Sequence, residues 1–399
     1  MTDLRFRGAV APLRRPNVDL PRNVAGVVAA LRPEAPLHCL RPATIAAAGA
    51  TFLGAFPGTV MYAVKCNPDP TVLRALWNGG LRHFDCASAG EVRLVRSMFP
   101  LAEIHFMHPV KARGAIREAF SEHGVRDFVL DSSAELAKIL EETGGTGLNL
   151  IIRLGLPKGG AVYDLSGKFG AEPAEAVALL RAARPHAGKL GVSFHVGSQC
   201  LDPAAYARAI ALAASVIREA GVKVEVLDVG GGFPVAYPDV VPPPLSAFMD
   251  AIGEAFAQAD LPGVELWAEP GRALVAGGAS IVVQVQARRD GMLFINDGVY
   301  GALSDAGAPG FRFPVKLMRP SEAPLVPFSF FGPTCDTADR MEGPFLLPGD
   351  AQEGDWIEIG QLGAYGACLR TAFNGFDRAG MVEVADLPLL ETPGYALAA

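Results

Sequence analysis

Cysteine is sparse in this chain of 399 residues, and it is not arranged as a metal site or a disulfide framework. The six cysteines are Cys39, Cys66, Cys86, Cys200, Cys335 and Cys368. They form no CxxC pair and no Cys/His spacing of the kind that binds zinc. We therefore expect reduced thiols in a cytoplasmic protein without a metal centre.

Basic runs, a secretory signal and an uninterrupted apolar span are also missing. The net charge of -7 and the absence of basic clusters argue against a nucleic-acid-binding protein. The N-terminus is polar and contains several arginines and prolines, unlike a signal peptide. Residues 43–64 carry no charge, but Gly49, Gly54, Pro57 and Gly58 interrupt them. A helix, a turn and a strand are expected there, and no membrane association.

What is present is enough apolar sequence for a large core, since half of the residues are hydrophobic. Eight strand-like segments are predicted at 60–64, 82–86, 104–108, 127–131, 148–154, 190–196, 224–229 and 264–269. Helical periodicity fills most of the intervals between them. This alternation predicts a (β/α)8 barrel, with a doubly wound open sheet as the alternative.

Nearly every predicted strand ends in a polar or charged residue. These residues are Lys65, Asp85, His108, Asp131, Arg153, His195, Asp228 and Glu269. In a barrel such ends converge on the carboxyl face, where active sites are built. In the apolar stretch VMYAVKCNP, strand alternation places Lys65 on the same face as Met61 and Ala63. The function of a lysine at the end of such an apolar strand is therefore the first question. Its amine either extends to water or lies in a dry pocket for covalent chemistry.

The pattern changes after about residue 276. Strand-like runs occur at 280–288, 292–297 and 355–360 without long helices between them. Clusters of glycine and proline separate these runs. A separate all-β domain is the prediction for this part of the chain.

Three motifs at strand ends can carry chemistry. LDVGGGFP contains Gly230, Gly231 and Gly232, which form either a flexible turn or a loop whose N–H groups approach an anion. AEPGR places Glu269 and Arg272 as a surface ion pair or as ligands for a ring and a phosphate. SFHVGSQ supplies His195 and Ser198, although a core histidine is the commoner case. Together with a lysine amine, they make sense for pyridoxal 5'-phosphate (PLP), whose aldehyde condenses with lysine and whose ring nitrogen a carboxylate keeps protonated.

Eight motifs together resemble one family. They are YAVKCNP, FDCASAGE, SFHVGSQ, LDVGGGFP, AEPGR, NDGVYG, FGPTCDTADR and TAFNGF. They resemble the fold-type III PLP decarboxylases, closest to ornithine/lysine decarboxylase, over roughly residues 36–376. The resemblance implies an alanine-racemase-like PLP-binding barrel at 36–275 and a C-terminal β-domain at 276–399 that the N-terminal segment 1–35 joins. It also implies a homodimer with shared active sites.

The resemblance further implies roles for individual residues. Expected cofactor contacts are Lys65, Asp85, Arg153, His195, Ser198, Gly230, Gly231, Gly232, Glu269, Gly271, Arg272 and Tyr365, with Glu91 in the supporting polar shell. Expected catalytic residues are Lys65 as the Schiff-base lysine, Glu269 as the pyridinium partner, His195 stacked on the ring and Cys335 as a proton donor. Expected substrate contacts are Asp336, Asp305, Tyr300 and Phe373.

The implied reaction is decarboxylation of a basic L-amino acid, ornithine or lysine, giving putrescine or cadaverine for polyamine biosynthesis. The segment ALSDAGAPGF departs from ornithine-specific members, which carry a second aspartate there, and Asp305 is the available substitute. Diaminopimelate decarboxylase, a racemase of the same fold and a non-catalytic regulatory homologue are the alternatives. Glu269 disfavours the racemase, and retention of the lysine, glutamate, arginine and cysteine disfavours the non-catalytic protein.

Overall fold

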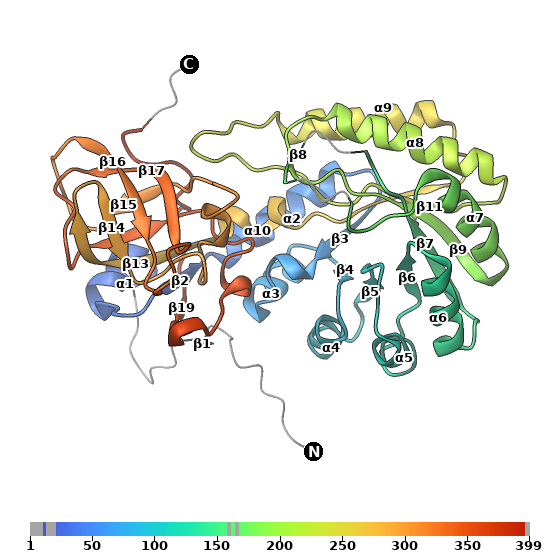
Figure 1. Cartoon of the computed structure of the whole chain (residues 1–399), viewed down its shortest axis with the longest axis horizontal. Helices are drawn as coiled ribbons and strands as arrows, with labels where there is room; N and C mark the ends of the chain where they lie inside the picture. Colours follow the sequence, from blue (N-terminus) through green and yellow to red (C-terminus); the bar gives the residue numbers. More distant parts are fainter. Residues whose placement is uncertain (1–10, 13–20, 158–160, 164–166, 396–399) are drawn as a thin grey trace. The chain divides into compact units, whose positions relative to one another are not determined.

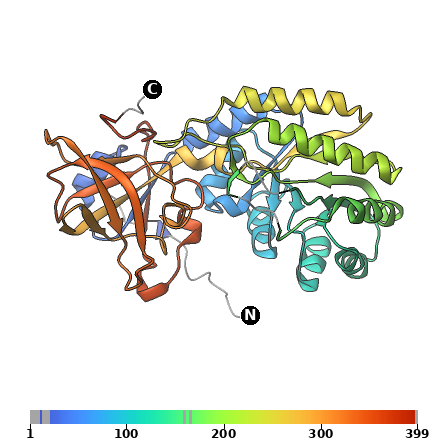
Figure 2. The ribbon, with the colours of Figure 1, turned by 45° about the horizontal axis from the view of Figure 1, so that its top comes forward.

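A computed structural model describes residues 11–12, 21–157, 161–163 and 167–395 (Figure 1). The chain divides into two compact units. The first, called the barrel unit, comprises Gly49–Pro234 and Pro242–Leu274. The second, called the β unit, comprises Val235–Val241, the chain from Val275 onward and the N-terminal residues as far as Ala48, within the described ranges. Figure 2 shows the helices concentrated in the barrel unit.

The barrel unit is built on a closed ring of parallel strands, so the predicted (β/α)8 barrel is confirmed and the open sheet is excluded. The strands are β3 (Thr59–Ala63), β4 (His83–Cys86), β5 (Glu103–Phe106), β6 (Asp127–Leu130), β7 (Leu148–Arg153), β9 (Ala187–Ser193), β11 (Val226–Asp228) and β12 (Glu265–Ala268), and β12 pairs with β3 to close the ring. Each strand overlaps the segment predicted for it. A cluster of apolar side chains that includes Met61, Ile151 and Trp267 packs in the core of this unit.

Helices lie outside these strands (Figure 1). They are α3 (Pro70–Asn78), α4 (Ala89–Met98), α5 (Arg113–Ser121), α6 (Ser133–Thr143), α7 (Pro173–Ala183), α8 (Ala204–Ala220) and α9 (Leu245–Ala259), with the short α10 (Arg272–Val275) after β12. Local sequence explains several starts: the side chains of Asp69, Ser88 and Ser132 accept N–H groups at the first turns of α3, α4 and α6. The uncharged run at 43–64 forms α2 (Pro42–Ala55) and then β3. None of the helices in the described ranges is long and apolar enough to cross a membrane.

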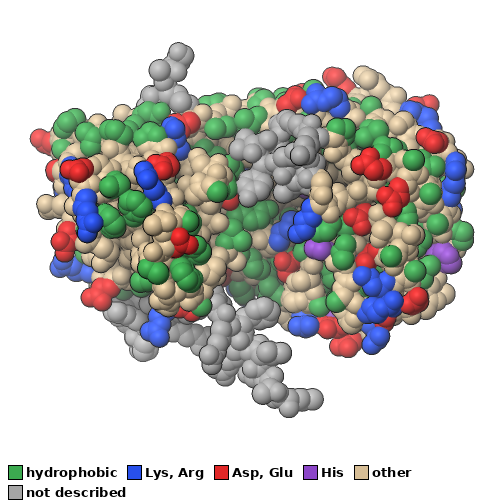
Figure 3. All heavy atoms as spheres, viewed as in Figure 1, with side chains coloured by type: hydrophobic (Ala, Val, Ile, Leu, Met, Phe, Trp, Pro, Cys, Tyr) green, Lys and Arg blue, Asp and Glu red, His purple; other side chains and the backbone are tan. Residues whose placement is uncertain are grey.

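The β unit contains a nine-stranded mixed sheet within the described residues, in agreement with the expected all-β domain. Its strands are β1 (Ala11–Pro12), β2 (Leu37–Leu40), β13 (Ala279–Arg289), β14 (Met292–Ile295), β15 (Val315–Leu317), β16 (Leu325–Phe331), β17 (Arg340–Pro348), β18 (Trp356–Ile359) and β19 (Gly380–Glu383). Most pairs are antiparallel. The sequence located β13, β14 and β18 but not the others. On the face drawn in Figure 3, acidic and basic side chains are interspersed.

The N-terminal part of the chain bears on the expected start of the barrel at residue 36. Strand β2 pairs with β13 and β19, so it belongs to the mixed sheet. Helix α1 (Val24–Leu31) packs its buried valines against the same sheet, in a cluster with Cys39 and Val282. Residues 1–10 and 13–20 of the expected N-terminal segment lie outside the described residues. The domain boundaries at 35/36 and 275/276 otherwise stay predictions.

Candidate active site

Lys65 lies just beyond a barrel strand and not within it. Strand β3 ends at Ala63, and Lys65 occupies a 3-10 turn, η1 (Val64–Cys66), so the expected strand alternation at this position was wrong. The turn directs the amine to the end of the neighbouring strand, where Nζ lies 3.0 Å from Oδ2 of Asp85. The Lys65 side chain is 42% exposed, whereas that of Asp85 is fully buried. An accessible amine is thus oriented by a carboxylate that water does not reach.

Two further buried carboxyl groups lie at the ends of β11 and β12. Asp228 and Glu269 are 0% and 4% exposed. Burial raises the pKa of Glu269 well above its usual range, and the negative charges of Asp228 and Asp85 raise it further. Burial likewise raises the pKa of Asp228 to about 6. Oε1 of Glu269 is buried without a hydrogen-bond partner in the described protein. This arrangement favours a bound group that brings a positive charge or a donated proton.

The three glycines after β11 form a tightly packed junction. Gly230 and Gly232 have φ values of 69° and 101°, which favour glycine. A Cβ added at Gly230, Gly231 or Gly232 would lie 2.2, 2.6 or 2.4 Å from a backbone oxygen of a neighbouring loop. The N–H of Gly230 donates to Asp228 over 2.8 Å. Glycine is therefore required for packing here, which disfavours a merely flexible turn and leaves the anion-binding interpretation open.

His195 lies in the loop that follows β9, close to this junction. Its Nδ1 accepts the N–H of Gly197 over 3.0 Å, and a Cβ on Gly231 would lie 3.2 Å from Nε2. Burial, with the positive charges of Arg153 and Lys65, lowers the pKa of His195 well below its usual range. The ring is therefore neutral, and because Nδ1 accepts, its proton is on Nε2. Ser198, half-buried, begins β10 (Ser198–Cys200), which pairs with β8 (Ala161–Tyr163).

The AEPGR turn packs against the segment that carries Lys65. The N–H of Ala63 donates to the carbonyl of Pro270 over 3.2 Å. A Cβ on Gly271 would lie 3.0 Å from that of Cys66. Arg272 begins α10 and is only 6% exposed, so a surface ion pair is excluded for this arginine. Arg272 follows β12, and the half-buried Arg153 ends β7, so both residues lie at the carboxyl ends of barrel strands.

The expected substrate residues and Cys335 all lie in the β unit, and the structure brings four of them together. The hydroxyl of Tyr300 donates to Asp336, and the rings of Tyr300 and Phe373 are 4.9 Å apart. The exposed Cys335 lies beside Asp336 in the same loop, where its N–H donates to Asn374 over 3.1 Å. Two other expected residues are placed elsewhere in the unit.

Those two residues are the expected substrate contact Asp305 and the expected cofactor contact Tyr365. Asp305 occupies a separate turn, η4 (Ser304–Ala306). Tyr365, half-buried, has a φ of 52°, in the left-handed region that non-glycine residues rarely adopt. The expectation that Asp305 assists Asp336 stays a prediction.

Asp228 is a site residue that the sequence reasoning counted among the polar strand ends but did not assign to the cofactor. It is fully buried, it fixes the first glycine of the turn, and its charge acts on Glu269. The available signal was its position, since it ends a strand immediately before the glycines. A carboxylate there is both an acceptor for the turn and a neighbour of the next strand end.

Comparisons with known proteins agree with this geometry. Residues 43–276 match the family model described as pyridoxal-dependent decarboxylase, pyridoxal binding domain. The chain is 36% identical to Decarboxylase flvG of Aspergillus flavus, over 79% of this chain and 77% of that protein. It is 33% identical to the lysine/ornithine decarboxylase of Selenomonas ruminantium, over 82% and 84%. Its fold is similar to that of the arginine decarboxylase of Paramecium bursaria Chlorella virus, with a TM-score of 0.80, 31% identity and coverage of 90% and 99%.

The residues at the barrel mouth fit the pyridoxal group that this family uses. Among the described residues, Oε1 of Glu269 is a buried acceptor without a protein partner, as a protonated ring nitrogen requires. The amine of Lys65 is accessible to an aldehyde, and the glycine junction leaves no room for a side chain. The matched family model covers more than half of the chain, and the barrel, the amine and the carboxylates are those that the family needs. The chain belongs to the pyridoxal-dependent decarboxylases and is a PLP-dependent enzyme.

Proposed function

We propose that this protein decarboxylates a basic L-amino acid, ornithine or lysine, to give putrescine or cadaverine for polyamine biosynthesis in the cytoplasm. The observation that carries the proposal is the grouping of the Lys65 amine with the buried carboxyl groups of Asp85 and Glu269. When bound, PLP supplies a ring that accepts the electron pair left on the α-carbon as CO2 departs.

Several residues at the carboxyl end of the barrel hold this cofactor, each through a different contact. Lys65 holds its aldehyde carbon covalently, and Asp85 orients the amine. Glu269 keeps a proton on the ring nitrogen, because an anionic oxygen in a buried site stabilises an N–H⁺ strongly. The neutral ring of His195 packs on the cofactor without adding a competing charge. Arg153 offsets part of the negative charge of the carboxylates.

A second group of residues binds the phosphate. We assign to it the N–H groups of Gly230, Gly231 and Gly232, the hydroxyl groups of Ser198 and Tyr365, and the guanidinium of Arg272, with Gly271 allowing the close approach of its turn. Backbone N–H groups in a glycine turn and a buried arginine are the donors that a dianion prefers. The close packing of the glycines supports this assignment.

Asp336 is the residue we propose for the distal ammonium group of the substrate. The N–H of Ala338 and the hydroxyl of Tyr300 lower the pKa of Asp336, so its side chain is anionic at neutral pH. Tyr300 and Phe373 supply apolar surface for the methylene groups of the substrate. Two similar proteins bear names that specify lysine, ornithine or arginine, amino acids with a cationic side chain. We assign to Cys335 the delivery of a proton to the α-carbon after CO2 has left.

We propose further that the protein is a homodimer in which Cys335 and Asp336 complete the site of the other subunit. The support is their location, since the loop that carries them belongs to the β unit and not to a barrel strand. A pair of equivalent shared sites is the arrangement that two-fold symmetry produces from such a division.

Decarboxylation of ornithine, lysine, arginine and diaminopimelate, measured as CO2 release, tests the proposal. We expect turnover of ornithine or lysine, with Asp336→Ala raising KM by about tenfold or more at unchanged PLP content, because the distal ammonium loses its counter-charge. Asp305→Ala provides the comparison, and an equal rise in KM there would reinstate Asp305 as a substrate contact. Exclusive turnover of diaminopimelate, or no turnover by PLP-loaded protein, would refute the proposed substrate class.

A further inference from the structure

A buried ion pair in the β unit lies directly behind the substrate residues assigned above. Oδ2 of Asp297 and Nη2 of Arg370 are 2.6 Å apart, and their side chains are 2% and 1% exposed. The two residues are separated by 73 positions in the chain. Neither residue has a role in the function proposed above. An ion pair enclosed to this degree is costly to desolvate, so its retention calls for an explanation beyond stability.

Asp297 organises the short turn that carries Tyr300. Its carboxylate accepts the N–H of Gly298 over 3.0 Å and that of Ala302 over 3.3 Å, which closes the turn from both ends. A Cβ on Gly301 would lie 1.6 Å from Oδ1 of Asp297, so the turn wraps tightly around the carboxylate. Any shift of this carboxylate therefore moves the backbone of Tyr300.

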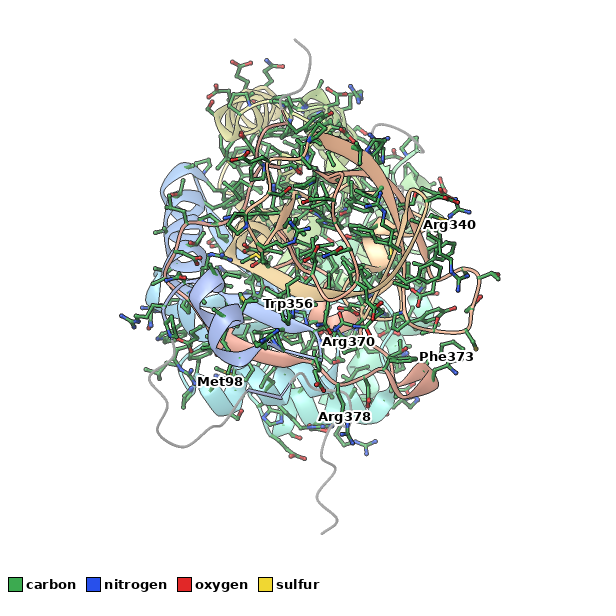
Figure 4. All side chains as sticks on the ribbon, turned by 90° about the vertical axis from the view of Figure 1, so that its left-hand side faces the viewer. Met98, Arg340, Trp356, Arg370, Phe373 and Arg378 are labelled. Carbon is green, nitrogen blue, oxygen red and sulfur yellow. The ribbon has the colours of Figure 1, made fainter. Side chains whose placement is uncertain are left out.

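Arg370 fixes the segment that carries Phe373 to the same carboxylate. Its Nη1 donates to the carbonyl of Phe376 over 3.3 Å, beyond the 3-10 turn η6 (Phe373–Gly375). The next residue, Thr371, donates its N–H to the carbonyl of Tyr300 over 2.8 Å. Figure 4 shows Arg370 within the β unit and Phe373 near its edge. The guanidinium thus joins the carboxylate that closes the Tyr300 turn to the carbonyl just beyond the Phe373 turn.

The effect extends to the loop of Cys335 and Asp336 through two hydrogen bonds. Asn374, inside turn η6, accepts the N–H of Cys335, and Tyr300 donates to Asp336. Tyr300, Phe373, Cys335 and Asp336 form what we call the distal patch. Every member of the distal patch is therefore connected to the Asp297–Arg370 pair through no more than three further residues.

We propose that Asp297 and Arg370 are positioning residues, which set the geometry of the distal patch and thereby the binding of the substrate's distal group. The pair touches neither substrate nor cofactor in this scheme. It acts by holding two turns and one loop in a single arrangement. The inference rests on the proposed function, since it assigns a substrate-binding role to the distal patch.

The test is steady-state kinetics of PLP-loaded Arg370→Met, Arg370→Lys and the double variant Asp297→Asn/Arg370→Met. We expect Arg370→Met to raise KM for the basic amino acid by about tenfold while kcat per bound PLP changes less than about threefold, because ground-state and transition-state binding are lost together. Arg370→Lys keeps the charge and should recover part of the loss. The double variant leaves no unpaired buried charge, so it should unfold at a higher temperature than Arg370→Met but keep the raised KM.

Arg319→Met is the matched control, because Arg319 pairs with Asp350 and Asp355 of the same unit and contributes nothing to the distal patch. It should leave KM unchanged. Hydrogen exchange supplies a readout independent of turnover: the amides of Gly298, Ala302 and Thr371 should exchange at least about tenfold faster in the double variant. An active wild-type protein with an unchanged KM in folded Arg370→Met, or unchanged exchange in the double variant, would overturn the inference. Wild-type protein that decarboxylates no basic amino acid would instead refute the proposed function.

Discussion

Replacing Glu269 by glutamine tests the electrostatic design of the barrel mouth with minimal change in shape. Glutamine keeps one carbonyl oxygen and nearly the same volume, but it cannot carry the negative charge that stabilises a protonated ring nitrogen. Glu269 is 4% exposed and its Oε1 has no protein partner in the described structure. We therefore expect the variant to fold, to bind PLP and to turn over slowly.

The size of the effect follows from the burial of the site. A hydrogen bond to a charged group contributes about 1.5–3 kcal/mol net, against about 0.5–1.5 kcal/mol for a neutral one. In a buried site, losing a group aimed at charge that develops in the transition state costs about 2.7–4 kcal/mol. At about 1.36 kcal/mol per factor of ten, the larger figures correspond to a loss of roughly 10²-fold or more in kcat.

The assay is kcat per bound PLP, with PLP content measured from its absorbance after release. The chain offers a matched control on the same strand, since β12 begins at Glu265 and Glu269 follows its last residue. Glu265 forms an exposed ion pair with Lys189 at 3.1 Å. Glu265→Gln should retain wild-type kcat, because exposed ion pairs contribute little.

One result would refute the reasoning. If Glu269→Gln binds PLP fully and turns over within about twofold of the wild type, the negative charge of Glu269 does not sustain the electron-accepting ring. A loss of PLP binding alone would instead show that Glu269 holds the cofactor in place without tuning it. The two outcomes are separated by normalising turnover to bound PLP.

Three further predictions concern attachment, assembly and pH. Lys65→Ala should lose the visible absorption of the bound cofactor, and borohydride reduction of the wild type should place the adduct on Lys65; an adduct on Lys111 or Lys168 would contradict the assignment. Mixing inactive Lys65→Ala with inactive Cys335→Ala should restore up to about a quarter of wild-type activity, because about half of the dimers are mixed and each has one intact site; no recovery despite confirmed subunit exchange would exclude shared sites. Burial raises the pKa of Glu91 to about 7, so the folded state binds this proton more tightly than the unfolded state and loses stability as pH rises towards 7. In urea unfolding, Glu91→Gln should be more stable than the wild type by about 1–3 kcal/mol at pH 8.5 and similar to it near pH 4; an equal difference at both pH values would contradict this.

The barrel was predictable because its strands are short apolar runs separated by helices. The β unit was harder to read, for reasons that particular strands make clear. Strand β16 contains Pro327 and β17 contains Pro344, and a proline within a run argues against a central strand. Strand β2 has only four residues and pairs with partners more than 200 residues away in the chain. Such pairing leaves no local signal in the sequence.

The residues at the strand ends were predictable as a group, but the burial of each side chain was not. Position alone indicated that Lys65 and Asp85 lie at one end of a barrel. Only the folded chain reveals that Asp85 is buried while the lysine remains accessible. The Asp297–Arg370 pair was not predictable from the sequence at all. The two residues are 73 positions apart, and the sequence indicates neither their burial nor their contact.

Asp228 and Glu269 lie close together, and as a pair they respond to the charge of a bound group in a way that neither carboxyl group would alone. Strands β11 and β12 are parallel neighbours with Asp228 opposite Trp267, so Glu269 follows only two positions later. Two buried carboxyl groups this close cannot both ionise without a nearby cation, which is why the pKa of Glu269 is raised by Asp228 as well as by burial. Without a cation the pair relieves this repulsion by keeping a proton on Glu269, which hydrogen-bonds to Asp228. A bound ring that presents an N–H⁺ would let Glu269 ionise instead. We propose that an ionised Glu269 then stabilises the protonated ring, the form in which PLP accepts electrons best.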